Sequence, residues 1–230
     1  MSGQRRKFSI PWVGIIVYIL GIITSIAVSL VTPLVSSILE AQFNGYSYHV
    51  LIPGCSQEWK LSEALDSQQA SCKGSLLLLR PSSTQNISRA IYFGNGKTFA
   101  NDYQIRVTID QMSTGVCAGV FMRENREIGT GYAFYVCQNG SAVIYRYDKN
   151  AVPLQIAGGL AKNQSNNSAT ITAVTQGDIL KLFVNGKLVC SNEDNAYAAT
   201  DIVSLIVSPS GAPVGSDVAA FSDFRMDRIR

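Results

Sequence analysis

Residue types that form metal and acid–base sites are scarce in this sequence. It has one histidine, His49, and although it contains five cysteines, no two of them form a C-x-x-C pair. Zinc sites are built from closely spaced cysteine and histidine ligands, so this composition argues against a zinc centre. We expect no metal and no other cofactor. The chain beyond His49 also lacks a histidine that could act as a general base.

Charge is also sparse, because charged residues make up 15% of the chain and the formal net charge is +3. Three basic residues, Arg5, Arg6 and Lys7, stand together near the N-terminus, and the rest of the chain is close to neutral. Proteins that bind nucleic acid neutralise phosphates with clustered lysine and arginine side chains. We therefore expect no nucleic-acid partner.

The longest uncharged stretch is residues 8–39, FSIPWVGIIVYILGIITSIAVSLVTPLVSSIL. A bilayer core needs about 20 apolar residues of helix, so this stretch is long enough to span it. A cleaved signal peptide has the same basic start, but its apolar part is about 7 to 15 residues long. No small-x-small cleavage site follows Leu39. We expect an uncleaved transmembrane helix over residues 10–39.

The basic cluster before this helix sets its expected orientation, because positive residues flanking a span stay in the cytoplasm. Residues 1–9 then form a short cytoplasmic tail. Residues 40–74 form a connector and the first part of an outer domain, which continues over residues 75–230. The sequence thus predicts a single-pass protein of the plasma or inner membrane with an extracytoplasmic C-terminal domain.

Gly21, Ser25 and Ser29 follow one another at intervals of four residues within the predicted helix. This spacing places three small side chains on one helix face, where a second transmembrane helix can approach closely. A transmembrane protein partner is therefore one reading of this face, although small residues are common in any membrane span.

The outer domain consists of short segments with alternating apolar and polar residues, a pattern typical of all-β proteins. Asn185-Gly186 predicts a tight hairpin. With no long helical period, the pattern predicts an all-β fold of two antiparallel sheets packed as a jelly-roll sandwich. We expect strands at residues 75–80, 89–93, 102–110, 116–123, 131–137, 142–148, 169–175, 178–184, 187–190, 202–208 and 218–228.

Three of these strands can be placed in register by pairing Cys117 with Cys137 and setting the next turn at residues 138–141, which pairs Ala133 with Arg146. One face is then apolar and belongs to the core; it carries Val116, Ala118, Val120, Met122, Tyr132, Phe134, Val136, Val143, Tyr145 and Tyr147. The opposite face carries Cys117, Phe121, Arg123, Tyr135, Arg146 and Asp148.

This second face mixes aromatic rings with charged groups, as sugar-binding surfaces do, because sugar rings stack on aromatics and their hydroxyls meet polar groups. The candidate ligand-binding residues are Phe121, Arg123, Tyr135, Arg146 and Asp148. An ordinary solvated sheet face with an Arg–Asp pair fits the same residues.

All five cysteines lie on the predicted outer side, where disulfides persist. A Cys55–Cys72 bond would close a loop of roughly 17 residues and stabilise the domain by about 3 kcal/mol. Cys117 and Cys137 are directly opposed in the register above and could form a cross-strand bond. Cys190 would then remain unpaired.

Glu124 and Glu127 suggest a glycosidase, but they fall in the loop that closes the first hairpin. Retaining glycosidases hold two carboxyl groups about 5 Å apart, with the pKa of one raised by its surroundings. A mobile turn that contains arginine does not provide this, so we expect both glutamates to be solvated.

The segments YQIRVTI (103–109), AGVFMRE (118–124), YAFYV (132–136), GDILKLFVNGKLV (177–189) and AAFSDFRM (219–226) give this chain a resemblance to the concanavalin A-like lectin/glucanase superfamily, in the branch with laminin G-like and 3-keto-disaccharide hydrolase-like domains. The resemblance implies a curved jelly roll whose concave face binds glycans, with Arg123, Tyr135 and Arg146 on that face. It also implies a calcium ion in some members, for which SNEDN (191–195) is the candidate loop, although a solvated turn fits that loop as well.

The related laminarinase-type enzymes carry an E-x-D-x-x-E motif on one strand, and this sequence lacks it. The sequence therefore favours a non-catalytic, membrane-anchored domain that recognises glycan or cell-envelope polymer. An accessory subunit of a larger membrane complex, anchored through Gly21, Ser25 and Ser29, is the alternative, and a glycoside hydrolase is a third and weaker one.

Overall fold

The computed structural model describes residues 47–56, 59–61, 70–81, 87–93, 102–125, 127–150, 152–161, 168–198, 200, 202–210 and 217–229. The predicted transmembrane helix at 10–39, with Gly21, Ser25 and Ser29, lies outside these ranges and stays a prediction. Within them, no helix is long and apolar enough to cross a bilayer. All regular secondary structure in the described ranges is β-strand.

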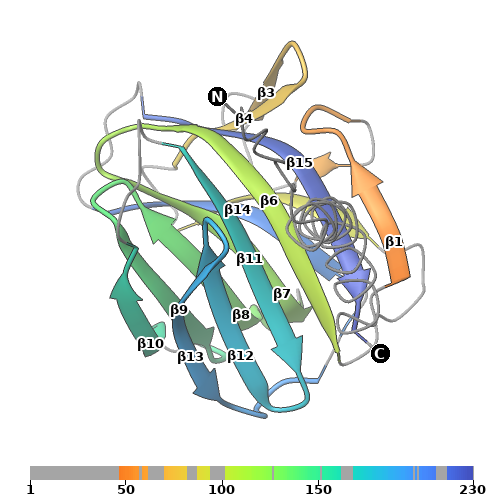
Figure 1. The fold of residues 1–230 in the computed structure, drawn as a ribbon, viewed down its shortest axis with the longest axis vertical. Helices are drawn as coiled ribbons and strands as arrows, with labels where there is room; N and C mark the ends of the chain where they lie inside the picture. Colours follow the sequence, from red (N-terminus) through yellow and green to blue (C-terminus); the bar gives the residue numbers. More distant parts are fainter. Residues whose placement is uncertain are drawn as a thin grey trace, which may run out of the picture. The chain divides into compact units, whose positions relative to one another are not determined.

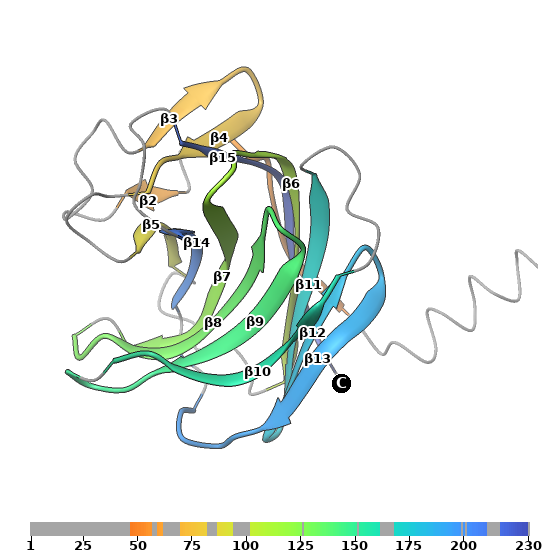
Figure 2. The same cartoon turned by 90° about the vertical axis from the view of Figure 1, so that its left-hand side faces the viewer.

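The strands form two antiparallel sheets that lie face to face (Figures 1 and 2). The first sheet has the order β13-β12-β11-β6-β15-β4-β3, with β1 paired to β15. Its strands are β1 (Ser47–Ile52), β3 (Ala70–Lys73), β4 (Leu76–Leu79), β6 (Tyr103–Met112), β11 (Ala169–Gln176), β12 (Ile179–Val184), β13 (Lys187–Glu193) and β15 (Ala219–Arg228).

The second sheet has the order β10-β9-β8-β7-β14-β5-β2 and is visibly curved in Figure 2. Its strands are β2 (Lys60–Leu61), β5 (Ser88–Phe93), β7 (Val116–Asn125), β8 (Thr130–Cys137), β9 (Ser141–Tyr147), β10 (Leu154–Leu160) and β14 (Ile202–Pro209). The all-β, two-sheet prediction is thereby confirmed for the described part of the chain.

Every strand predicted from the sequence has a counterpart, but β1, β2, β3 and β10 were not predicted. The segment of β10, LQIAGGL, contains two glycines and has exposed leucines at both ends, so it lacks the alternation that marks a strand. In β3, three of four residues are exposed. β1 and β3 join the first sheet and extend it N-terminal to residue 75.

The main core lies between the two sheets. In β6, Tyr103, Ile105, Val107 and Ile109 are buried and alternate with more exposed residues, as expected for a strand with one face on the core. In β8, in contrast, every residue is buried. At this strand, the side chains on both faces of the second sheet are therefore shielded from solvent.

Asn185 and Gly186 form the predicted hairpin turn between β12 and β13, where Val184 pairs with Lys187. Both turn residues have positive φ, 51° and 75°, which a two-residue type I′ turn requires. Asparagine and glycine tolerate this conformation better than other residues, so the sequence signal was specific.

Cys55–Cys72 and Cys117–Cys137 are disulfides, as predicted. The second joins directly opposed residues of β7 and β8. Cys190 is the free cysteine. It is buried, and this burial raises the pKa of its thiol to about 11, which disfavours the reactive thiolate form.

Candidate functional site

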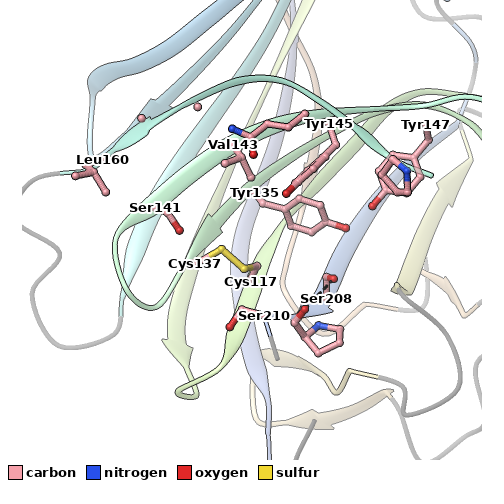
Figure 3. Close-up of a pocket in the computed structure, with 15 residues that line it drawn as sticks. Cys117, Tyr135, Cys137, Ser141, Val143, Tyr145, Tyr147, Leu160, Ser208 and Ser210 are labelled. Carbon is pink, nitrogen blue, oxygen red and sulfur yellow. Dashed lines mark hydrogen bonds between the residues drawn. A yellow bond between two sulfur atoms is a disulfide. The ribbon is translucent and has the colours of Figure 1, made fainter. Parts of the chain in front are cut away.

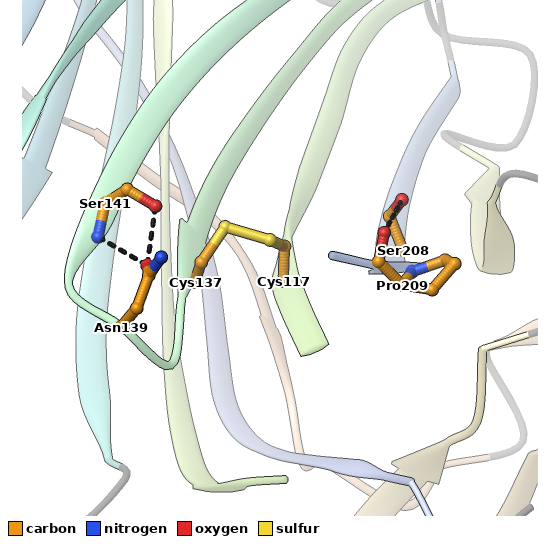
Figure 4. The surroundings of a disulfide bond; sticks show 6 residues. All are labelled: Cys117, Cys137, Asn139, Ser141, Ser208 and Pro209. Carbon is orange, nitrogen blue, oxygen red and sulfur yellow. Dashed lines mark hydrogen bonds between the residues drawn. A yellow bond between two sulfur atoms is a disulfide. The ribbon is translucent and has the colours of Figure 1, made fainter. Parts of the chain in front are cut away.

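The pairing of β8 with β9 differs by one residue from the predicted register. Tyr135 lies opposite Val143, and Tyr132 lies opposite Arg146. The turn has three residues, 138–140, and Gly140 adopts a φ of 87°, whereas the prediction used a four-residue turn. Figure 4 shows how Asn139 stabilises this turn, since its Oδ1 accepts hydrogen bonds from the N–H (3.0 Å) and Oγ (2.6 Å) of Ser141.

A slip of one residue moves every side chain of a strand to the opposite face. Ala142 and Ile144 accordingly belong to the main core, while Val143, Tyr145 and Tyr147 lie on the other face of the second sheet. The prediction that Val143 and the two tyrosines build the core was therefore wrong. We call the face turned away from the first sheet the outer face.

Arg123 does not lie on the outer face, contrary to prediction. It has a φ of 51°, and the register of β7 shifts between Met122 and Asn125, which marks a bulge that re-aims the side chain. The guanidinium donates hydrogen bonds to the carbonyl oxygens of Gly177 (2.6 Å) and Tyr197 (3.0 Å). Arg123 is buried, and its side chain connects the second sheet to the turn between β11 and β12 and to the loop after β13.

Arg146 and Asp148 are also absent from the outer face, because the register slip turns both of them inward. Arg146 donates to Asp148 and, at 2.8 Å, to Oδ2 of Asp194. Tyr132 donates to Oδ1 of Asp194 at 2.5 Å, and Tyr197 donates to Asp148. This polar network attaches the loop after β13 to β8 and β9. Arg123, Arg146 and Asp148 thus lie apart from Phe121 and Tyr135, and the prediction that these five residues share one face was wrong.

The network engages Asp194, the second of the two acids of the SNEDN loop. Burial disfavours its charged form, but hydrogen bonds from Tyr132, the Ala196 N–H and Arg146 outweigh burial and lower the pKa of its carboxyl. Among the described residues, no group of three or more histidine, cysteine or acidic side chains could hold a metal ion.

Asp194 should make folding more stable above its ordinary pKa, and this contribution should disappear as the pH falls through the lowered pKa. We expect Asp194→Asn to be less stable than the wild type at pH 7, with the gap narrowing below about pH 4. Urea unfolding at a series of pH values measures this difference in the free energy of unfolding. Glu193→Gln, at the exposed neighbouring position, is the control, and its stability should change with pH as that of the wild type does. A stability difference between Asp194→Asn and the wild type that stays the same at every pH would contradict this role of Asp194.

The outer face carries its own apolar cluster. Phe121 and Tyr135, two of the predicted binding residues, do lie on it. The cluster consists of Ile87, Cys117, Phe121, Ala133, Tyr135, Cys137 and Ile206, with Val143, Tyr145 and Tyr147 packed against it. The outer face is therefore not the solvated sheet face that fitted the same residues in the sequence, because these side chains are buried.

A cavity of about 800 Å³ opens on this face, within the size range of ligand sites. Tyr135, Tyr145 and Tyr147 line it, together with the Cys117–Cys137 disulfide and polar side chains that include Ser141 and Gln155. Figure 3 shows the rings of Tyr135 and Tyr145 side by side, between the disulfide and Tyr147. Their centroids are 6.2 Å apart at an interplanar angle of 73°.

The hydroxyl of Tyr135 is the most unusual polar group at the cavity. The residue is 2% exposed, and its Oη has no hydrogen-bond partner of regular geometry within the described residues. Burial raises the pKa of Tyr135 well above its ordinary value, and the neighbouring Tyr147 hydroxyl adds to this rise. The phenol therefore stays protonated well above neutral pH and acts as a hydrogen-bond donor.

Glu124 also lies at the outer face, and the expectation that it is solvated was wrong. It is fully buried, where Arg89 donates to its Oε1 and Ser204 donates to its Oε2 at 2.5 Å. The guanidinium of Arg89 in turn lies 4.8 Å from the centroid of the Phe121 ring. Glu127 is exposed in the hairpin turn, as predicted. The bulge at Arg123 carries Glu124 out of the expected turn and into the sheet.

No family model matches this sequence, and no curated protein matches it. The structure, however, is similar to several solved structures. The CBM66 carbohydrate-binding module of Bacillus subtilis is 14% identical with a TM-score of 0.55, and the alignment covers 74% of this chain and 95% of the module. The β-glucanase of Bacillus licheniformis is 10% identical with a TM-score of 0.57, and the alignment covers 80% and 99%.

The endo-β-1,3-glucanase of Pyrococcus furiosus has a TM-score of 0.61 at 9% identity, over 80% of this chain and 95% of that enzyme. Identities this low carry information about the fold alone. The neighbours include both carbohydrate-binding modules and glucanases. The described part of this chain therefore has the galectin-like or concanavalin A-like jelly-roll fold.

Proposed function

We propose that this β-sandwich is a non-catalytic carbohydrate-recognition domain that binds glycan or cell-envelope polymer in the outer-face cavity. In this proposal the segment at residues 10–39 anchors the domain to the membrane and leaves the cavity on the extracytoplasmic side. The observation that carries the proposal is the cavity itself, where Tyr135, Tyr145 and Tyr147 meet on the outer face of a fold shared with a carbohydrate-binding module.

The chemistry of this lining suits a sugar. Aromatic rings offer large, rigid apolar surfaces on which the C–H faces of a pyranose can stack. Tyrosine and serine hydroxyls and the Gln155 amide offer donors and acceptors for sugar hydroxyls. Tyr145 and Tyr147 are less deeply buried than Tyr135, so a ligand in the cavity would meet their rings first.

Two observations support binding without cleavage. The described residues that line the cavity include no aspartate or glutamate. The buried Glu124 is engaged on both oxygens, by Arg89 and Ser204. Glycosidases place two carboxyl groups about 5 Å apart when they retain configuration, or roughly 6.5–9.5 Å apart when they invert it.

A glycan array tests this proposal. The full chain, solubilised in mild detergent, is applied to arrayed oligosaccharides, and each glycan that is retained is then incubated with the protein and sized by mass spectrometry. We expect retention of at least one glycan class and no shortening of the chains. A folded protein that retains no glycan would overturn the recognition role, and shortened products would overturn its non-catalytic character.

A further inference from the structure

The described lining of the cavity carries no charge, although a charged residue lies close to it. None of the described lining residues is a lysine, arginine, histidine, aspartate or glutamate. An acidic sugar bound there would bring a carboxylate against tyrosine rings and serine hydroxyls without a cationic partner. Burying an unpaired charge is costly, whereas hydroxyl groups meet matching partners.

The nearby charge is that of Arg89, on β5. Its guanidinium lies 4.8 Å from the centroid of Phe121, and that ring is 5.3 Å from the ring of Tyr147, which lines the cavity. Burial raises the pKa of both Tyr135 and Tyr147, whereas the positive charge of Arg89 works to lower the pKa of both phenols. Arg89 is therefore close enough to influence the cavity wall electrostatically.

Glu124 cancels this charge. It is fully buried and forms an ion pair with Arg89, whose side chain is 21% exposed. The pair formed by Arg89 and this carboxylate has no net charge. A carboxylate of this kind would be an expensive way to stabilise the sheet alone, because burying an ion pair costs about as much free energy as the attraction returns.

On the basis of the proposed function, we propose that the cavity selects uncharged saccharides and that Glu124 is a specificity-determining residue, because it neutralises Arg89. The ligand class is then a neutral oligosaccharide or neutral polymer segment. Uronic acids and other anionic sugars would find no free cation among the described residues that line the cavity.

The test compares the full chain in detergent with two variants, Glu124→Gln and Arg89→Met/Glu124→Gln. The probes are a neutral panel of laminari-, cello-, xylo- and manno-hexaoses and an acidic panel of galacturonate, guluronate and mannuronate hexamers. Calorimetric titration in about 20 mM salt preserves electrostatic effects, which are screened at about 0.5 M.

We expect the wild type to bind its best neutral hexaose at least about tenfold more tightly than any acidic hexamer. Glu124→Gln leaves Arg89 without its counter-ion, so affinity for the acidic hexamers should rise by about three- to tenfold at low salt, and neutral binding should stay within about twofold. The double variant removes both charges and should restore the wild-type preference.

Tighter wild-type binding of the acidic panel would overturn this inference while leaving the proposed function intact. If a folded protein binds neither panel and also retains no glycan on the array, the proposed function itself fails. An unchanged acidic affinity in Glu124→Gln, with the fold verified by circular dichroism, would remove Glu124 from the selectivity. Should that variant fail to fold, the ranking of the two panels by the wild type still decides the ligand class.

Discussion

Replacing Tyr145 with alanine should weaken binding of the preferred glycan by about 2 kcal/mol, or roughly thirtyfold in Kd. The ring is half-buried on β9 and lines the cavity next to Tyr135, so its loss removes a stacking surface and widens the site. Calorimetric titration of the variant with the glycan selected by the array measures the effect.

Leu188→Ala is the matched control for this variant. Leu188 is a large apolar residue, 53% exposed on β13 of the first sheet, and it does not line the cavity. The Leu188→Ala variant should bind the glycan with the affinity of the wild type. If Tyr145→Ala kept its full affinity while remaining folded, the outer-face cavity would not be the binding site.

Replacing Arg89 with methionine should destabilise the fold by about 3 kcal/mol, because it leaves the carboxylate of Glu124 buried without a cation. Among the described residues, only the hydrogen bond from Ser204 would still oppose this charge. Methionine keeps much of the apolar stem that packs near Phe121, so the loss reports on the ion pair rather than on packing. Urea unfolding at pH 7 measures the difference in free energy.

The double variant Arg89→Met/Glu124→Gln shows whether the instability of Arg89→Met comes from the buried charge of Glu124 or from altered packing. It removes both charges and should regain most of the lost stability, since replacing both partners of a buried pair is often close to neutral. A double variant as unstable as Arg89→Met would show that the instability does not come from an uncompensated Glu124.

Much of the fold could be predicted because strong local signals agree with it. Asn185-Gly186 specifies a type I′ hairpin through its backbone preferences, and period-two alternation located most strands. The pairing of Cys117 with Cys137 was also correct and fixed the register of β7 against β8 as far as Met122. These features depend on a few neighbouring residues.

The site was less predictable because it depends on two backbone irregularities. The turn at 138–140 is one residue shorter than the sequence QNGS suggests, which brings Tyr145 and Tyr147 onto the outer face. The bulge at Arg123 removes that arginine from the face and adds Glu124 to it. An Asn-Gly pair is compatible with more than one turn length, and the positive φ of an arginine leaves no sequence signal.

β10 is a strand that the sequence pattern could not predict. Its glycines give it little strand propensity, yet it pairs with β9 and contributes Gln155 to the cavity. Its place in the sheet comes from pairing with an already formed edge and not from its own residues. The cavity wall that it supplies was therefore invisible in the sequence.

The central claim is that the tyrosines of the outer face hold the ligand. The most direct measurement is an NMR titration of the full chain, labelled in its tyrosine rings, with the glycan that the array selects. The ring signals of Tyr135, Tyr145 and Tyr147 should shift together with increasing glycan, while that of Tyr103, buried in the main core, should not. Saturable binding that leaves all three cavity tyrosines unshifted would contradict the account.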